Sequence, residues 1–208
     1  MSVEEVPPFA VGRPLVRAAY SWAARRHVGQ SRAVDDAPFI LHPIEVAALL
    51  SSRGYDDEVI AAGLLHDVVE NTETGIGDVR DRFGDRVAQI VAAVTEDEAI
   101  EEYEQRKAAL REQVAAAGPD AHVVYAADKL AKTRELRAQA ASGDGRVDDA
   151  ALDRRLEHYE DSLQMLEVVA ADLALVHQLA FELWAMRQLP PRGHGAWRGR
   201  PSHAASPS

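Results

Sequence analysis

The segment Leu64-Leu-His-Asp-Val-Val-Glu70 holds the residues whose types and spacing best suggest chemistry. His66 and Asp67 are adjacent. On a helix, Glu70 would lie one turn after His66, and Asn71 one turn after Asp67. The neighbouring residues are almost all apolar, which predicts a largely buried helix. Buried ionisable groups must be paired or must hold a metal ion. The simpler alternative is a polar stripe that faces solvent.

Two other positions add candidate ligands for a metal ion. His42 precedes a proline one predicted helix earlier, and Asp128 lies in a long predicted helix later in the chain. With the His-Asp pair they form a nitrogen and oxygen ligand set without sulfur. Such a set suits a divalent ion such as manganese, iron or magnesium and leaves positions open for water. Each residue also has a simpler interpretation: His42 could cap the next helix, and Asp128 could pair with Lys132 on a solvated face.

The elements that must position these residues are all predicted to be helices. Apolar residues recur at the helical period along almost the whole chain, and runs with the period of a strand are few. Asp56 is a suitable N-cap, and Pro43 suits a first helical turn. The expected helices cover residues 12–27, 43–53, 56–71, 76–82, 84–95, 100–117, 121–141 and 148–187.

Composition excludes several classes of function. The chain has no cysteine, which excludes a disulfide scaffold, a thiol nucleophile and an iron–sulfur cluster. It has 34 acidic residues against 23 Lys and Arg, a formal net charge of −11. Because this overall charge repels phosphate, we expect no binding to nucleic acid. A small anionic substrate would need a local cationic patch or a metal ion.

We expect one helical domain over residues 12–187, after an N-terminal extension over 1–11. Residues 188–208 are rich in Gly, Pro and Ser and lack periodicity, which predicts a disordered tail. The first residues do not resemble a signal peptide, and no stretch reaches the roughly 18 apolar residues of a membrane span. The sequence therefore predicts a cytoplasmic protein without a membrane partner. It leaves the oligomeric state open, a homo-oligomer included.

Five segments, in this order, resemble the HD-domain alarmone hydrolases, which include the hydrolase domain of the Rel/SpoT enzymes and the free-standing MESH-type enzymes. The resemblance extends from about residue 15 to about residue 170. The segments are Gln30-Ser-Arg32, Ala37-Pro-Phe-Ile-Leu-His42-Pro-Ile-Glu-Val-Ala, Leu64-Leu-His-Asp-Val-Val-Glu-Asn-Thr72, Phe83-Gly-Asp-Arg-Val-Ala and Ala127-Asp-Lys-Leu. The resemblance implies an all-α HD-domain helical bundle, a bound divalent ion that is usually Mn²⁺, and removal of pyrophosphate from the 3′ position of (p)ppGpp.

The resemblance also implies roles for individual residues. The implied metal ligands are His42, His66, Asp67 and Asp128. The catalytic carboxylate is Glu70, followed by Asn71. The expected substrate-binding residues are Arg32, Arg106, Lys107, Lys132 and Arg134. For Arg106 and Lys107, a solvated helix face remains an alternative.

The chain departs from the family pattern beside these residues. Asn71 replaces an Asp, and an amide cannot accept a proton from water at neutral pH. Lys132 replaces an Asn, Glu135 replaces a Thr, and Ala33 stands where a Lys is usual. The expected metal ligands are therefore complete, while the expected substrate wall is altered.

Three functions follow as hypotheses. The first is a metal-dependent phosphohydrolase of a phosphorylated nucleotide, with (p)ppGpp as the first candidate. Adenosine alarmones, 3′-phosphorylated nucleotides and NADPH-like phosphates are alternative substrates. The second is a metal- or nucleotide-binding module with weakened catalysis, which Asn71 would mark. The third is a purely structural helical protein, which the full ligand set disfavours.

Overall fold

The computed structural model describes residues 6–33, 35–142 and 149–188. Within these residues the chain is all-α, as predicted, and the only extended pairing is an isolated bridge between Ser31 and Pro38. The elements are η1 (Pro8–Ala10), α1 (Pro14–Arg26), α2 (Leu41–Ser51), α3 (Asp57–Leu65), α4 (Val68–Asn71), α5 (Ile76–Phe83), α6 (Asp85–Val94), α7 (Tyr103–Ala117), α8 (Pro119–Ser142), α9 (Asp149–Val169) and α10 (Ala174–Arg187).

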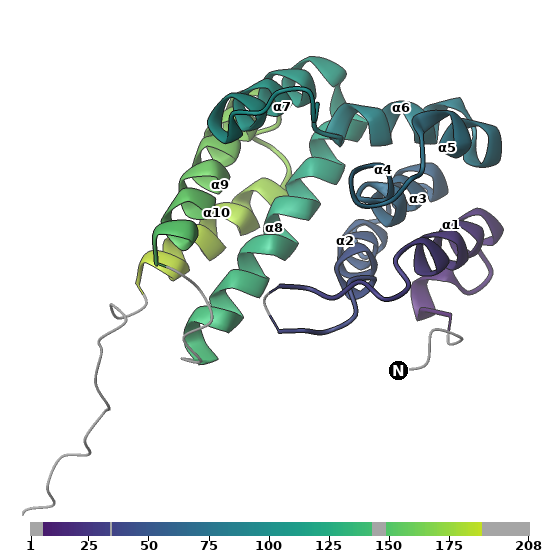
Figure 1. The fold of residues 1–208 in the computed structure, drawn as a ribbon, viewed down its shortest axis with the longest axis horizontal. Helices are drawn as coiled ribbons and strands as arrows, with labels where there is room; N and C mark the ends of the chain where they lie inside the picture. The colour runs from purple at the N-terminus through teal and green to yellow at the C-terminus, as the bar shows by residue number, and fades with distance from the viewer. Residues whose placement is uncertain (1–5, 34, 143–148, 189–208) are drawn as a thin grey trace, which may run out of the picture.

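Helix α8 runs through the middle of the molecule, with α1 to α5 to one side of it and α9 and α10 to the other (Figure 1). It packs against α2, α3, α6, α7, α9 and α10. Residues 121–131 are all buried, because neighbouring helices cover this part of α8 on every side. A charged residue in this stretch is therefore removed from water whichever way it points, and needs a charged or polar partner.

Helices α2 and α3 approach each other closely at Gly63. A Cβ atom on Gly63 would lie 2.6 Å from Cδ1 of Leu50, so the packing depends on the missing side chain. Asp56 caps α3 as predicted, since its side chain accepts hydrogen bonds from the backbone N–H groups of Glu58 and Val59. Helix α2 carries His42, and His66 and Asp67 follow directly after the end of α3.

Two expected helices are each broken in the structure. The helix expected over 56–71 ends at Leu65 and resumes at Val68. In a regular helix consecutive side chains point about 100° apart, and the break lets two adjacent side chains face the same centre. The helix expected over 148–187 turns at residues 170–173, where α10 folds back along α8 and α9. No Gly or Pro marks either break, which is why the sequence did not predict them.

The predicted domain limits are only partly covered by the described residues. Pro8–Ala10 in the predicted extension forms a single turn that packs on α1, and Ala10 is fully buried. Residues 1–5 and 189–208, which include almost all of the predicted tail, lie outside the described part. Among the described helices, none is both long enough and apolar enough to span a membrane.

Candidate metal centre

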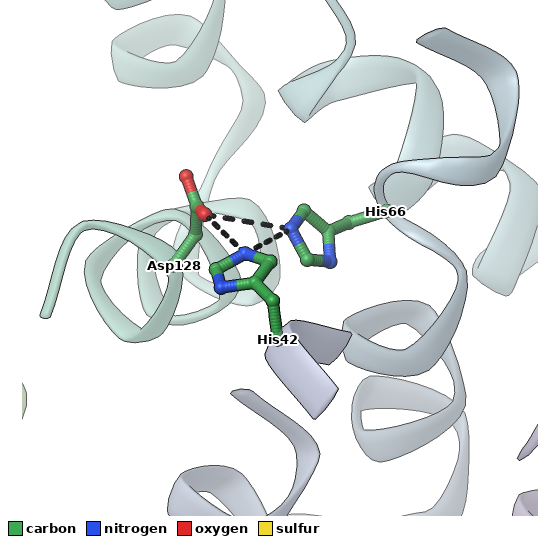
Figure 2. Close-up of side chains that lie close together, drawn as sticks. All are labelled: His42, His66 and Asp128. Atoms are coloured by element: carbon green, nitrogen blue, oxygen red, sulfur yellow. Dashed lines mark hydrogen bonds and ion pairs between the residues drawn. The ribbon is translucent and has the colours of Figure 1, made fainter. Parts of the chain in front are cut away.

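His42 lies in the first turn of α2 and is 2 % exposed. Pro43 occupies the same turn, as predicted, although the helix begins at Leu41. The N-cap residue is Ile40, and no side chain caps this helix. His42 is therefore not a capping residue. Its imidazole points away from α2 toward α8 (Figure 2).

His66 and Asp67 occupy the break between α3 and α4, and both are 3 % exposed. Nδ1 of His66 lies 2.8 Å from the carbonyl oxygen of Gly63. A carbonyl oxygen can only accept, so Nδ1 carries a proton, and Nε2 is the nitrogen left to bind a metal ion. The local backbone thus fixes the tautomer that a metal ligand requires.

The side chains of His42, His66 and Asp128 converge, although they come from α2, from the break after α3 and from α8 (Figure 2). The Nε2 atoms of His42 and His66 are 3.3 Å apart. Oδ1 of Asp128 lies 3.0 Å from Nε2 of His42 and 3.4 Å from Nε2 of His66. Ligands in neighbouring positions around an octahedral divalent ion, at about 2.1 Å from it, are separated by about 3 Å. The three groups are positioned to bind one metal ion.

The carboxylate of Asp67 also lies close to the converging ligand atoms of the two histidines. Its Oδ2 lies 3.5 Å from Nε2 of His42 and 3.2 Å from Nε2 of His66. This buried oxygen accepts no hydrogen bond from any described residue. A buried carboxylate oxygen without a donor fits a cation better than it fits an apolar interior. The residues present therefore suit the divalent ion that the HD-domain resemblance implies.

The field at this centre favours positive charge. Burial opposes protonation, but the carboxylates of Asp67 and Asp128 raise the pKa of His66 to about 10. Burial likewise opposes ionisation of Asp128, yet Lys129 and Lys132 hold its pKa well below the usual value for an aspartate. The carboxylates are thus charged, and they compensate for a buried cation.

Glu70 lies beside the centre, on α4, and is half-buried. Burial, and then the charge of Asp67, raise the pKa of its carboxyl. Oε1 accepts a hydrogen bond of 2.7 Å from the backbone N–H of Glu96. Glu70 and Asn71 line a cavity of about 330 Å³. The side chain of Asn71 is exposed, and the backbone carbonyl oxygen of Asn71 accepts a hydrogen bond from the side-chain amide of Gln30.

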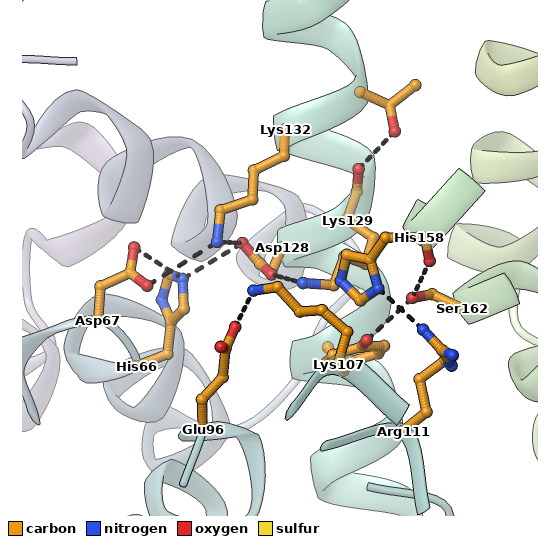
Figure 3. Close-up of polar contacts among 12 residues, drawn as sticks. His66, Asp67, Glu96, Lys107, Arg111, Asp128, Lys129, Lys132, His158 and Ser162 are labelled. Atoms are coloured by element: carbon orange, nitrogen blue, oxygen red, sulfur yellow. Dashed lines mark hydrogen bonds and ion pairs between the residues drawn. The ribbon is translucent and has the colours of Figure 1, made fainter. Parts of the chain in front are cut away.

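Arg106 and Lys107 line this same cavity from α7. Both pair with Glu96. Nε of Arg106 lies 2.9 Å from Oε2 of Glu96. Nζ of Lys107 contacts Oε1 of Glu96 (Figure 3). Burial lowers the pKa of Lys107. The two residues are neither fully solvated nor unpaired, so the alternative of a solvated helix face is wrong.

His42 also lines a second cavity, of about 350 Å³, whose lining contains several Lys and Arg side chains. Lys107 lines both cavities. The basic residues around the second cavity are Arg32, Lys107, Lys129, Lys132 and Arg155. Its aromatic residues are Phe39, Tyr103 and Tyr159. In a chain with a formal net charge of −11, this is a local positive patch of the kind that a phosphorylated ligand needs.

Of the five predicted substrate-binding residues, Arg134 is the one that is not among the lining residues of either cavity. Its Nε lies 3.2 Å from Oε1 of Glu182 on α10, and its Nη1 lies 4.0 Å from Glu45. Arg32, Lys107 and Lys132 line the larger cavity, and Arg106 lines the smaller one. The face of α8 that carries Arg134 turns toward α10, and a role for Arg134 in substrate binding stays a prediction.

The sequence did not single out the cavity residues of α9. Arg155, His158 and Tyr159 share one helix face through their i, i+3 and i+4 spacing, which was the available signal. His158 is 3 % exposed, and its Nδ1 accepts a hydrogen bond of 3.0 Å from Arg111 (Figure 3). Its Nε2 finds no partner among the described residues. Burial and the surrounding cations, Lys129 first, lower the pKa of His158 to about 2, so the ring is neutral.

Comparison with known proteins agrees with this geometry. Residues 19–153 match the family model described as HD domain. MESH1 from Danio rerio, named a guanosine-3′,5′-bis(diphosphate) 3′-pyrophosphohydrolase, is 33 % identical over 173 residues, covering 80 % of this chain and 91 % of that protein. MESH1 from Homo sapiens is 38 % identical over 121 residues, covering 57 % of this chain and 67 % of that protein.

Longer proteins also match over part of their length. A GTP pyrophosphokinase from Streptomyces coelicolor is 39 % identical over 125 residues, but the match covers 59 % of this chain and only 15 % of that protein. A solved structure described as "A metazoan ortholog of SpoT hydrolyzes ppGpp and plays a role in starvation responses" has a TM-score of 0.72 and 26 % identity, covering 89 % of this chain and 99 % of that one. The chain belongs to the HD-domain family, in the branch that contains the MESH1 proteins.

Proposed function

We propose that this protein is a metal-dependent phosphohydrolase that removes pyrophosphate from the 3′ position of (p)ppGpp. The observation that supports this most is the meeting of two features at His42: a cluster suited to a divalent ion and a cationic cavity of about 350 Å³. The names of the MESH1 relatives and of the similar solved structure support the same substrate.

We propose Mn²⁺ as the ion, with Asp67 as a fourth ligand beside His42, His66 and Asp128. When bound, a divalent ion lowers the pKa of a water ligand toward neutrality and neutralises charge on phosphate oxygens. Nitrogen and oxygen ligands without sulfur suit this ion. The proposed compartment is the cytoplasm, where a nucleotide substrate is available.

Glu70 is the proposed proton acceptor. Its raised pKa brings it closer to the neutral range in which a general base works best. The hydrogen bond from the N–H of Glu96 to Oε1 fixes the carboxylate. No hydrogen bond to Oε2 is seen among the described residues, so this oxygen is free to orient a water molecule and take its proton. Asn71, one turn after Asp67, can hold that water but cannot accept the proton.

The cations of the two cavities hold the phosphates. Lys107 lies between the cavities, and Lys132 lies beside the metal ligands. A nucleotide with phosphate groups at two positions can therefore be neutralised at both ends. The rings of Phe39 and Tyr103 offer apolar surface for the base at the wall of the larger cavity.

The test is a substrate panel with purified, Mn²⁺-loaded protein. The panel contains ppGpp, an adenosine analogue with the same 3′-pyrophosphate, adenosine 3′,5′-bisphosphate and NADPH, and the readout is released phosphate or pyrophosphate. We expect pyrophosphate from ppGpp, and none after chelation. Turnover of another member without turnover of ppGpp would overturn the proposed substrate. Such a change of substrate would have a physical cause, because Lys132 and Glu135 alter the cavity wall relative to the family pattern.

A further inference from the structure

Glu135 touches both a proposed metal ligand and a cation of the larger cavity. It lies on α8 two turns after Asp128, and its side chain is 13 % exposed. Its Oε1 lies 3.3 Å from Nδ1 of His42 and 3.0 Å from Nη1 of Arg32. One carboxylate oxygen of Glu135 therefore lies between Nδ1 of His42, the ring nitrogen that faces away from the metal centre, and the guanidinium of Arg32 at the cavity wall.

The two histidines of the centre are held differently. Nδ1 of His66 is fixed by the carbonyl oxygen of Gly63 in the preceding helix α3, 2.8 Å away. Nδ1 of His42 is buried and has no hydrogen bond of good geometry among the described residues; Glu135 is the carboxylate that reaches it. Nδ1 of His66 thus has a backbone partner, whereas the group nearest to Nδ1 of His42 is a side-chain carboxylate.

We propose that Glu135 is a positioning residue for the metal centre, which orients His42 through Nδ1 and so increases affinity for the divalent ion. A ligand histidine whose second nitrogen donates to a carboxylate is fixed in the correct tautomer and is a more basic ligand. This inference rests on the proposed function, because it assumes that the centre binds a divalent ion.

Arg32 completes the arrangement by holding Glu135 in place. Its Nε lies 3.1 Å from Oδ1 of Asp35, and its Nη1 reaches Glu135. A competing explanation is that Glu135 only compensates the charge of Arg32. Asp35 separates the two explanations, since it is the other carboxylate on Arg32 and has no contact with His42 among the described residues.

The experiment titrates Mn²⁺ into the metal-free full chain by calorimetry. We expect Glu135→Ala to bind Mn²⁺ about 10- to 100-fold more weakly than wild type, the usual loss when the partner of a ligand histidine is removed. Glu135→Gln keeps an oxygen that can accept from Nδ1, and should recover most of the loss. Asp35→Asn should bind Mn²⁺ as wild type does. Thermal unfolding of each metal-free variant checks that the fold is intact.

Equal Mn²⁺ affinity in wild type and Glu135→Ala would overturn the inference. So would an equal loss in Asp35→Asn and Glu135→Ala, because that result assigns the effect to Arg32. If Glu135→Ala does not fold, Glu135→Leu fills the space without an acceptor and allows the same comparison. The readout does not depend on turnover. A wild-type chain that binds Mn²⁺ but hydrolyses no nucleotide would overturn the proposed function alone.

Discussion

Nζ of Lys132 lies 2.9 Å from Oδ1 of Asp128, the same oxygen that faces both histidines of the metal centre. The ammonium group is also 3.9 Å from Asp67 (Figure 3). A fixed positive charge thus stands beside the position proposed for a divalent ion. It compensates the buried carboxylates, but it also repels the ion.

Replacing Lys132 should therefore strengthen metal binding. We expect Lys132→Asn to bind Mn²⁺ about tenfold more tightly, or ~1.4 kcal/mol, a modest effect for charges a few ångströms apart. The KM for a phosphorylated substrate should rise, because a cavity cation is lost. Calorimetry and steady-state kinetics measure the two effects. Arg134→Gln, on the same helix but paired with Glu182, is the matched control. Unchanged affinity in Lys132→Asn would show that the ammonium does not oppose the ion.

Removing an imidazole ligand should empty the centre. Wild type is expected to hold about one divalent ion per chain, and His66→Ala much less, since His66 is an expected ligand on geometric grounds. Elemental analysis of purified protein gives the ratio directly. His177→Ala removes an exposed histidine of α10 and should keep the full complement. Undiminished metal in His66→Ala would disprove the assignment.

Glu70→Gln should abolish turnover while metal remains bound. The amide keeps the shape of the side chain and loses the ability to take a proton, which is worth about 10²- to 10⁴-fold in rate. The measurement is kcat, with metal content determined in parallel. Glu98→Gln, in the same small cavity, should retain most of the activity. Full rate in Glu70→Gln would assign the proton to another group.

Asn71→Asp should raise kcat by about tenfold, less than the roughly 10²- to 10⁴-fold that a positioned acid–base group contributes, because Glu70 already covers part of that role. The added carboxylate is repelled by Asp67 and Glu70, and a bound divalent ion offsets that repulsion. The gain should therefore vanish without metal. Comparing kcat across pH for both proteins measures it. An unchanged or lower kcat at every pH would mean that Asn71 suits this protein's own chemistry.

His158 should make stability depend on pH. Burial and nearby cations lower its pKa to about 2 in the folded chain, against 6.5 as the ordinary value. Below pH 6.5 the unfolded chain binds a proton that the folded chain does not, so this group destabilises the fold as the pH falls. Between pH 7.5 and 5.5 the loss is about 1.4 kcal/mol.

His158→Gln keeps a hydrogen-bond acceptor for Arg111, and its amide does not bind a proton in either the folded or the unfolded chain over this pH range. The free energy of unfolding of His158→Gln, relative to wild type, should therefore rise by about 1.4 kcal/mol between pH 7.5 and 5.5. Urea unfolding at the two pH values measures the difference. A difference that stays constant would show that His158 is not held neutral.

The sequence predicted most of the helices and singled out the side chains that the structure brings together around His42. Helix α5 was expected over 76–82 and spans Ile76–Phe83, and Asp56 caps α3 as expected. These features depend on local spacing and capping, which the sequence displays directly. The structure brings together His42, His66 and Asp128, which the sequence could group only through separate motifs.

The sequence could not show which face of a helix meets the cavity. Lys132, Arg134 and Glu135 lie within one turn of α8, yet only Lys132 and Glu135 line the larger cavity, while Arg134 pairs with Glu182. The sequence does not mark the break at His66 either, because neither His66 nor Asp67 is a Gly or a Pro. Both features depend on how α8 packs against α2, α3 and α10, which is decided by contacts distant in sequence.

The metal centre draws its side chains from positions far apart in the chain: 24 residues separate His42 from His66, and 86 separate His42 from Asp128. The site therefore does not exist in a chain that has formed its helices but not yet packed them. We infer that ion uptake distinguishes the native chain from a compact, loosely packed one with the same helical content. Retained Mn²⁺ would then serve as a check on refolded or heat-treated preparations, independent of circular dichroism.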